Sequence, residues 1–331
     1  IFNHPYGTPR NPWDLGRNPG TSSSGSGAAT AAFLCATSLG EDTGGSIRFP
    51  ASWCGLVGMK PSWGRVSRYG VMGGVWSMDT VGPISRSVED AAITLGVIAG
   101  HDPQDPYTWD IPVPDYREAL TGDIRGLRVG LVTEQTHTEV VDPDVKEAVI
   151  KATTVLGELG ATVEEVSVPL SRHSMLITIA LLAVEPASTH REWVKERPED
   201  YLWGNRIQML SGSILPAQAY YKAQKLRAML RQEVLQALDS YDVLVMPTVR
   251  KTAQNIESFS QGTLMRRPYL LTATFNLANA PAISIPCGFS EDGLPIGLQI
   301  GAKPGADETV LRVAHAYEQN TDWHNWRPPT I

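Results

Sequence analysis

The second half of the chain alternates between short apolar runs and a stretch with helical periodicity. Residues 127–132 form an apolar run of strand length, and residues 162–166 form another. Between them, five apolar residues recur at helical spacing on one face: Val145, Val149, Ala152, Leu156 and Leu159. Gly160 follows this stretch in the manner of a C-cap glycine. The pattern predicts a β–α–β unit.

Further segments extend this alternation. The other predicted elements are a short buried helix over 28–37, mostly helical structure over 200–238, strands over 241–246, 282–286 and 296–300, and an amphipathic helix over 306–319. Residues 1–20 are rich in Pro, Gly and Asn and are typical of a loop. Because strands and helices alternate, we expect an α/β sheet covered by helices on both faces, in a single domain spanning residues 1–331.

Composition and charge narrow the class of protein. Hydrophobic residues are 42% and charged residues 19% of the chain, as in ordinary globular proteins. The net charge is −7 and no basic stripe stands out, so we expect no nucleic-acid partner. The sequence has no run of 18 apolar residues, so we expect no membrane span. Cys35, Cys54 and Cys287 lack metal-ligand spacing, which predicts reduced thiols, no metal site and a cytoplasmic location.

Two glycine–serine segments carry the candidate chemistry. Residues 20–27 (GTSSSGSG) are compatible with a flexible linker, and equally with a helix entry that presents backbone N–H groups to an oxyanion. Residues 42–48 (DTGGSIR) are compatible with a plain turn or with a nucleophile site. In the second case Gly44 and Gly45 let the backbone approach a substrate closely, and Ser46 attacks a carbonyl whose oxygen lies over these amides.

A nucleophilic serine needs a base, and the sequence does not offer an obvious histidine. The elbow motif G-x-S-x-G is absent, and none of the seven histidines has a site-like context. A Ser–Lys arrangement is the alternative, and it requires a lysine whose pKa is depressed by burial or by a neighbouring charge.

The two segments, with the motifs around them, resemble the amidase signature family. Residues 20–27, 40–50 (GEDTGGSIRFP) and 58–61 (GMKP) are similar to its G-G-S-S-G-G-S, G-x-D-x-G-G-S-I-R-x-P and G-L-K-P motifs, in the same order. Further matches cover essentially the whole chain: residues 77–84, 87–92, 241–244, 275–277, 281–286 and 293–299. The resemblance implies that family's fold, a central mixed β-sheet with helices on both faces.

The resemblance also implies a Ser–Ser–Lys triad that needs no metal or organic cofactor. Ser46 falls on the nucleophile, and Ser22, 24 residues earlier, falls on a bridging serine that follows a cis peptide bond. The oxyanion hole falls on the backbone N–H groups of Thr43, Gly44, Gly45 and Ser46. Asp42 and Arg48 fall on scaffold positions around the nucleophile.

The catalytic lysine has no counterpart in this sequence. Lys60 matches the structural lysine of G-L-K-P, and none of the 21 residues before Ser22 is a lysine. We therefore expect the chain to be N-terminally incomplete, and inactive and poorly folded when expressed alone. Thr21 and Ser24 also depart from the family, which most often has glycine at both positions.

For the substrate pocket, the sequence offers Ser23 and Trp76. Five further residues are compatible with a pocket or with ordinary core packing: Trp203, Met209, Leu210, Tyr220 and Tyr221. The expected activity is hydrolysis of a small amide, aryl amide or carbamate (urethane) through a serine acyl-enzyme. The sequence leaves open whether the chain forms a homodimer.

Two other functions stay open. One is the A-type subunit of a glutamine-dependent tRNA amidotransferase, which shares the fold and needs partner subunits. Residues 78–83 (MDTVGP) resemble free-standing amidases more, because that subunit tends to have glutamine at the position of Thr80. The other is an inactive binding module, which the missing lysine favours and the intact Gly44-Gly45-Ser46 turn disfavours.

Overall fold

The computed structural model describes residues 7–257 and 271–329. Within them, eight strands form one sheet in the order β1-β3-β2-β7-β8-β6-β4-β5. In that order the strands are Thr37–Glu41, Val81–Ser85, Val57–Lys60, Ala282–Phe289, Pro295–Gly301, Val243–Pro247, Arg128–Val132 and Thr162–Val166. Neighbours from β1 to β6 pair antiparallel, whereas β4 pairs in parallel with β6 and with β5. The sheet is mixed, as the resemblance implies.

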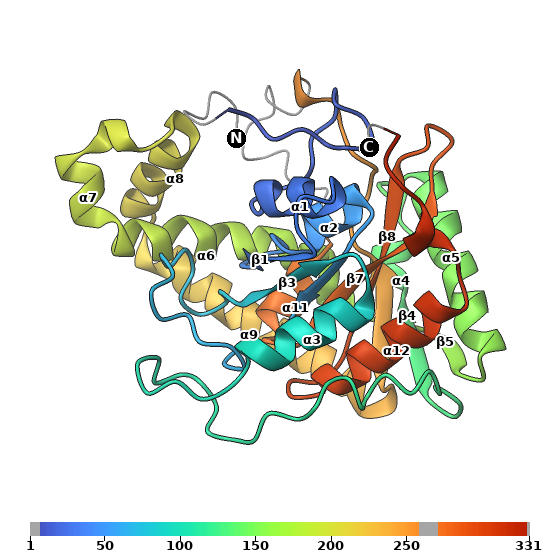
Figure 1. The fold of residues 1–331 in the computed structure, drawn as a ribbon. Coiled ribbons are helices and arrows are strands. Elements are labelled where there is room, and N and C mark those ends of the chain that lie inside the picture. Colours follow the sequence, from blue (N-terminus) through green and yellow to red (C-terminus); the bar gives the residue numbers. More distant parts are fainter. Residues whose placement is uncertain (1–6, 258–270, 330–331) are drawn as a thin grey trace.

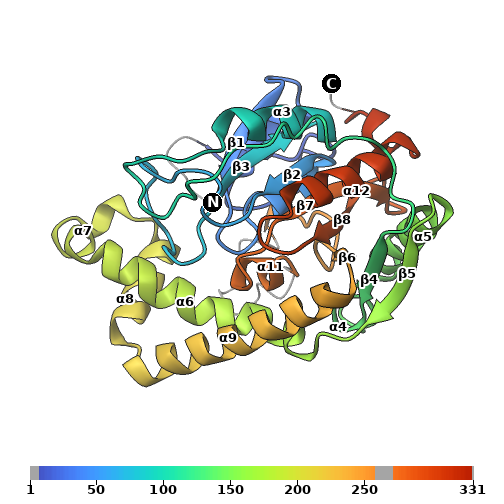
Figure 2. The same ribbon diagram turned by 90° about the horizontal axis from the view of Figure 1, so that it is seen from below.

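Helices cover both faces of the sheet, which confirms the predicted architecture (Figure 1). Helices α3 (Val88–Ile98), α5 (Pro143–Glu158) and α12 (Asp307–Gln319) bury their apolar residues against one face. Helices α6 (Ser174–Thr189), α9 (Ala217–Ser240) and α11 (Ala273–Leu277) form a second apolar cluster on the other. Figure 2 shows these layers on opposite sides of the strands.

The other helical segments are α1 (Ser24–Ala31), α2 (Arg48–Cys54), α4 (Thr133–Thr136), α7 (Arg191–Glu196), α8 (Trp203–Ile214) and the 3₁₀ turns Pro169–His173, Pro198–Asp200 and Trp323–Asn325. Helix α2 packs against β2, β7 and β8. None of the helices in the described ranges is long and apolar enough to cross a membrane. Cys35, Cys54 and Cys287 are free thiols.

The predicted β–α–β unit is present as β4, α5 and β5. Helix α5 starts with Pro143, whose fixed φ suits a first helical turn, and it buries Val145, Val149 and Leu156 against the sheet. Gly160 adopts a φ of +94° directly after the C-cap residue Leu159, which turns the chain towards β5. Parallel pairing of β4 with β5 then closes the unit.

The prediction is wrong at residues 28–37. Helix α1 begins earlier, at Ser24, and ends at Ala31, while β1 begins at Thr37. Phe33 adopts a φ of +58°, which takes the chain out of the helix between these two elements. Strand β1 is held by five residue pairs with β3, and not by an apolar pattern of its own.

Candidate active site

The predicted nucleophile lies in the turn between β1 and α2. Residues 42–46 leave β1 after Glu41, and Ser46 precedes Arg48, the first residue of α2. Ser46 is half-buried, and every residue of α2 is buried. The turn is therefore anchored on one side by a strand and on the other by a helix inside the core.

A buried ion pair fixes the shape of this turn. The Arg48 guanidinium lies 2.9 Å from Asp42 Oδ1, and both side chains are fully buried. Asp42 also accepts hydrogen bonds from the Gly45 amide (2.7 Å) and from Asn276 Nδ2 (2.7 Å). Burial alone would raise the pKa of Asp42, but the Arg48 charge and these hydrogen bonds lower it to about 2. Asp42 and Arg48 thus act as the predicted scaffold, with Asp42 ionised at neutral pH.

Residues distant in sequence complete this scaffold. Arg48 Nη1 donates to Gln299 Oε1 (2.6 Å) and to the Thr272 carbonyl (3.0 Å). The Thr272 hydroxyl donates to the Gly44 carbonyl over 2.6 Å. Sequence reasoning assigned no role to Thr272, Asn276 and Gln299, although Asn276 and Gln299 lie in segments that match the family. Helices and strands from the C-terminal part of the chain bring them to the turn.

Gly45 must be glycine at this position. Its φ is +127°, and a Cβ on Gly45 would clash with the Thr272 side chain. Its amide donates to Asp42, so it is not available to an oxyanion. Within the described ranges, the amides of Thr43, Gly44 and Ser46 have no hydrogen-bond partner. Of the four amides predicted for the oxyanion hole, these three are therefore without a partner among the described residues.

The segment around Ser22 lies directly beside the nucleophile turn (Figure 1, α1 and α2). The peptide bond between Thr21 and Ser22 is cis, as the resemblance implies, and Thr21 does not prevent it. The Ser23 amide donates to the Ser46 carbonyl over 3.3 Å, so the two serine segments are hydrogen-bonded to each other. Residues 20–27 are thus part of the fold and not a linker.

Ser23, a predicted pocket residue, is half-buried and its hydroxyl bonds to the main chain of β1. Its hydroxyl donates to the Glu41 carbonyl (3.4 Å) and accepts from the Glu41 amide (3.3 Å). A Cβ on Gly40 would come within 2.7 Å of this hydroxyl. Ser23 therefore fastens the start of α1 to β1, because its side chain faces that strand.

Lys60 is the buried lysine nearest in sequence to the two serines, and its amino group bonds to the main chain of the next residue. Its Nζ donates to the Pro61 carbonyl over 2.8 Å. Burial, and after it the nearby Arg48 charge, lowers the pKa of Lys60 to about 7. Within the described ranges no hydrogen bond joins Lys60 to Ser22 or Ser46, which fits its predicted structural role.

A carboxyl pair that the sequence did not single out lies next to the turn. Asp79 accepts from the Thr43 hydroxyl (2.7 Å) and from the amides of Gly74 (2.8 Å) and Val75 (2.7 Å). Burial, together with the nearby Asp79 carboxylate, raises the pKa of Glu41 to about 8. Asp79 thereby links the loop after residue 70 to the nucleophile turn.

Trp76 directly follows Val75, whose amide bonds to Asp79, and its side chain packs against two other aromatic rings. It makes edge contacts with Tyr107 (centroids 5.1 Å apart) and Trp63 (6.2 Å), and 54% of its surface is exposed. Arg68 donates to the Trp76 carbonyl over 2.6 Å. Trp76 remains a candidate for the pocket rim, and no described contact joins it to Ser46.

The candidates from residues 170–270 divide into two groups. Tyr220 is half-buried, and its hydroxyl donates to Glu185 (3.1 Å), which also accepts from the Ser77 hydroxyl (2.9 Å). Trp203, Leu210 and Tyr221 are exposed. Met209 is half-buried. Among the described residues of this region, Thr178 of α6 lies next to the turn, and its methyl group would lie 3.4 Å from a Cβ on Gly44.

Comparison with known proteins agrees with this geometry. A family model described as Amidase matches residues 2–311. The A-type subunit of a glutamyl-tRNA(Gln) amidotransferase from Gloeobacter violaceus is 44% identical over 352 residues, which cover 98% of this chain and 72% of the relative.

Two solved structures have the same fold. The A-type subunit of the glutamyl-tRNA(Gln) amidotransferase from Thermotoga maritima is 36% identical with a TM-score of 0.82, covering 94% of this chain and 68% of that one. A bacterial aryl acylamidase of the amidase signature family is 27% identical with a TM-score of 0.86, covering 97% and 69%.

Proposed function

The chain belongs to the amidase signature family, and from this premise we propose that it cleaves the C–N bond of an amide by acyl transfer to Ser46. The observation that carries the proposal is the turn held by Asp42 and Arg48. It places a half-buried serine next to amides that have no partner among the described residues. Such preorganised donors stabilise the negative charge of a tetrahedral intermediate.

The proposed steps use the two serines in turn. Ser46 Oγ forms a bond to the carbonyl carbon and gives its proton to Ser22 Oγ, which passes its own proton to a base, while the carbonyl oxygen becomes an oxyanion held by the amides. The C–N bond then breaks, and the leaving nitrogen takes a proton from Ser22, which recovers one from the base. Water attacks the acyl-enzyme, which releases the acid and restores the Ser46 hydroxyl. The base that assists Ser22 is, by resemblance, a lysine outside the matched motifs.

Hydroxylamine trapping tests the acyl-enzyme. A good amine nucleophile competes with water for the acyl group, so an amide substrate should yield a hydroxamate. Aryl amides and carbamates are the substrates with which to begin. Hydrolysis without hydroxamate would contradict the covalent route. Absence of both hydrolysis and fluorophosphonate labelling of Ser46 in the complete protein would favour a binding module.

The sequence relatives favour a more specific role, the A-type subunit of a glutamyl-tRNA(Gln) amidotransferase. Relatives with that name are 44% identical, whereas the aryl acylamidase is 27% identical. In this role glutamine is the amide substrate, and the released ammonia is passed to partner subunits. Thr80 is the residue that argues for a free-standing amidase instead.

A paired assay separates the two roles. Ammonia transfer from glutamine to glutamyl-tRNA(Gln), measured with added partner subunits of the amidotransferase, should occur only in the amidotransferase role. Turnover of aryl amides or carbamates without partners, together with no transfer, would assign the protein to the free-standing amidases.

A further inference from the structure

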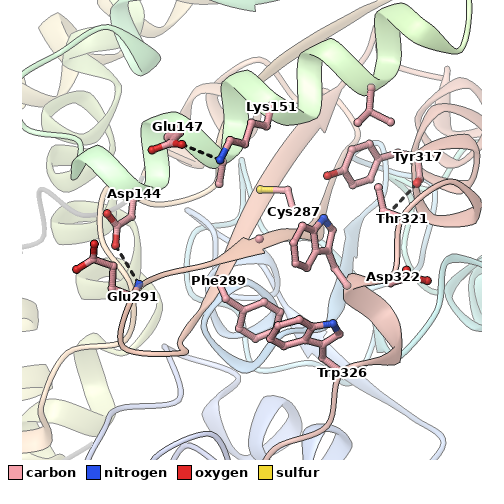
Figure 3. Close-up of a pocket in the computed structure, with 14 residues that line it drawn as sticks. Asp144, Glu147, Lys151, Cys287, Phe289, Glu291, Tyr317, Thr321, Asp322 and Trp326 are labelled. Atoms are coloured by element: carbon pink, nitrogen blue, oxygen red, sulfur yellow. Dashed lines mark hydrogen bonds and ion pairs between the residues drawn. The ribbon is translucent and has the colours of Figure 1, made fainter.

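A cavity lies away from the serine turn, at the C-terminal end of β7. Its volume is about 550 Å³, and it is an open hollow lined by α5, the end of β7, the end of α12 and the 3₁₀ turn Trp323–Asn325 (Figure 3). None of its lining residues belongs to residues 20–60, which carry both serines. The proposed acyl transfer therefore leaves this cavity without a role. Its volume lies in the range of small-molecule sites.

Aromatic rings form one side of the cavity. Phe289 and Trp326 are stacked, with centroids 4.5 Å apart and planes at 20°. Trp323 packs at an angle against both, at 6.0 Å from Phe289 and 5.7 Å from Trp326. Trp326 nevertheless keeps 51% of its surface exposed. The cluster thus presents open indole surface to the cavity, where it can contact a ligand.

Carboxylates share the lining of the cavity with these rings. Figure 3 shows Asp144 and Glu147 on α5, across the cavity from Phe289 and Trp326. Glu291 and Asp322 complete the group of four acids that line it. Lys151 is the one basic residue of the lining, and its Nζ lies 2.7 Å from Glu147.

The ion pair of Lys151 with Glu147 leaves three acids uncompensated. Within residues 7–257 and 271–329, no basic group forms an ion pair with Asp144, Glu291 or Asp322. Asp144 accepts a hydrogen bond from the Glu291 amide (3.3 Å), which holds two of these acids together. The rim therefore carries an excess of negative charge beside an aromatic wall.

We propose that this cavity binds a small organic cation, an alkylammonium or quaternary ammonium with an apolar body. Indole faces attract cations through their quadrupole, and the apolar body gains from contact with the rings. The three carboxylates outside the Lys151 ion pair add long-range attraction for the same charge. A neutral ligand would gain only the apolar contact, and an anionic ligand would be repelled.

Isothermal titration calorimetry of the full chain with benzyltrimethylammonium tests the proposal. Neopentylbenzene has the same shape without the charge and is the matched ligand. Binding of the cation, weakened by added salt, is expected together with binding of the neutral isostere that is at least about tenfold weaker. Equal binding of both ligands, or no binding of the cation up to 10 mM (roughly the limit of weak specific sites), would overturn the proposal.

Two variants assign the binding to this cavity. Trp326→Ala removes the exposed indole and should weaken cation binding by roughly tenfold, while Trp203→Ala, an exposed tryptophan of α8 outside the cavity, should leave it unchanged. Glu291→Gln should weaken binding, and Glu196→Gln, at an exposed glutamate of α7, should not. Cation binding that survives both Trp326→Ala and Glu291→Gln would contradict the site.

Discussion

The backbone amide of Ser23 donates a hydrogen bond to the carbonyl oxygen of Ser46, with 3.3 Å between the two atoms. This bond joins the cis-peptide segment to the nucleophile turn through main-chain atoms. Side chains in either segment can therefore be exchanged while the bond itself is kept. The relationship makes single-serine variants a clean test of the proposed roles.

Ser46→Ala should abolish acyl transfer while the protein remains folded. Removal of the nucleophile closes the covalent route, so kcat should fall by at least about 1,000-fold. Turnover of an amide substrate and labelling by a fluorophosphonate measure the loss, with circular dichroism as the check on folding. Near-normal turnover in the folded variant would show that another residue attacks.

Ser22→Ala should lower kcat by roughly 100- to 10,000-fold, because the proton relay between Ser46 and the leaving nitrogen is lost. Ser24→Ala is the matched control. The Ser24 hydroxyl donates only to the Ser22 carbonyl (3.2 Å), so its removal should have a small effect. If Ser24→Ala is the more damaging change, the assignment of the bridging serine is wrong.

Asp42→Asn should destabilise the fold by about 3–5 kcal/mol, since it leaves the buried Arg48 charge uncompensated. The folded pKa of Asp42 is about 2, below its ordinary value of 3.8. Its stabilisation is therefore fully present above pH 3.8 and is lost as the pH falls towards 2. Urea unfolding of wild type and variant across roughly pH 2–6 should show the two curves converging at the acid end. A constant gap would contradict the ion-pair account.

Gly45→Ala should cost more than about 1 kcal/mol and abolish activity, because the new methyl group meets Thr272 and the φ of +127° is strained. Gly293→Ala is the control for φ alone. Gly293 also has a positive φ, +74°, but nothing lies within 4 Å of its Cβ position. In thermal unfolding, Gly45→Ala should lower the melting temperature clearly more than Gly293→Ala. Equal losses would contradict the clash with Thr272 as the cause.

Glu41→Gln should stabilise the protein at alkaline pH. Burial, then the Asp79 charge, raises the pKa of Glu41 from 4.5 to about 8, so folding disfavours its ionised form. The wild type should lose stability as the pH rises from 4.5 to about 8, and the glutamine variant should lack this slope. Melting temperatures at about pH 5 and about pH 9 measure the difference, with the exposed Glu158→Gln as control. A variant with the same pH slope as wild type would show that Glu41 is not the group responsible.

Sequence periodicity predicted part of the fold, including β7 and α5, and did not predict β2, β3, α2, α3 or α6. Strand β7 is almost wholly buried and has an apolar run, while α5 combines helical spacing with Gly160. Strand β1 was not predicted, because its residues TSLGE form neither an apolar run nor an alternation of apolar and polar residues. Its structure comes from pairing with β3, 40 to 48 positions away, which no local pattern contains.

In the candidate site too, residues within continuous motifs could be predicted and residues distant in sequence could not. Ser46, Ser22, Asp42 and Arg48 lie in continuous motifs, so the resemblance to the family was enough to propose them. Thr272, Asn276 and Gln299 act on the turn from more than 220 positions away. Their role depends on the packing of α11 and β8 against α2, and this arises only when the sheet has assembled. Ser23 shows a further limit of the sequence, because its place in the motif does not reveal that its hydroxyl bonds to Glu41.

Helix α2 is buried along its entire length, from Arg48 to Cys54. Amides in such an element exchange with solvent only when the whole domain opens. Ser46, the proposed nucleophile, lies two residues before this buried helix, unlike a serine carried on a mobile loop. Heat inactivation should therefore coincide with global unfolding, and a protein that has lost its activity on warming should already have lost its tertiary structure.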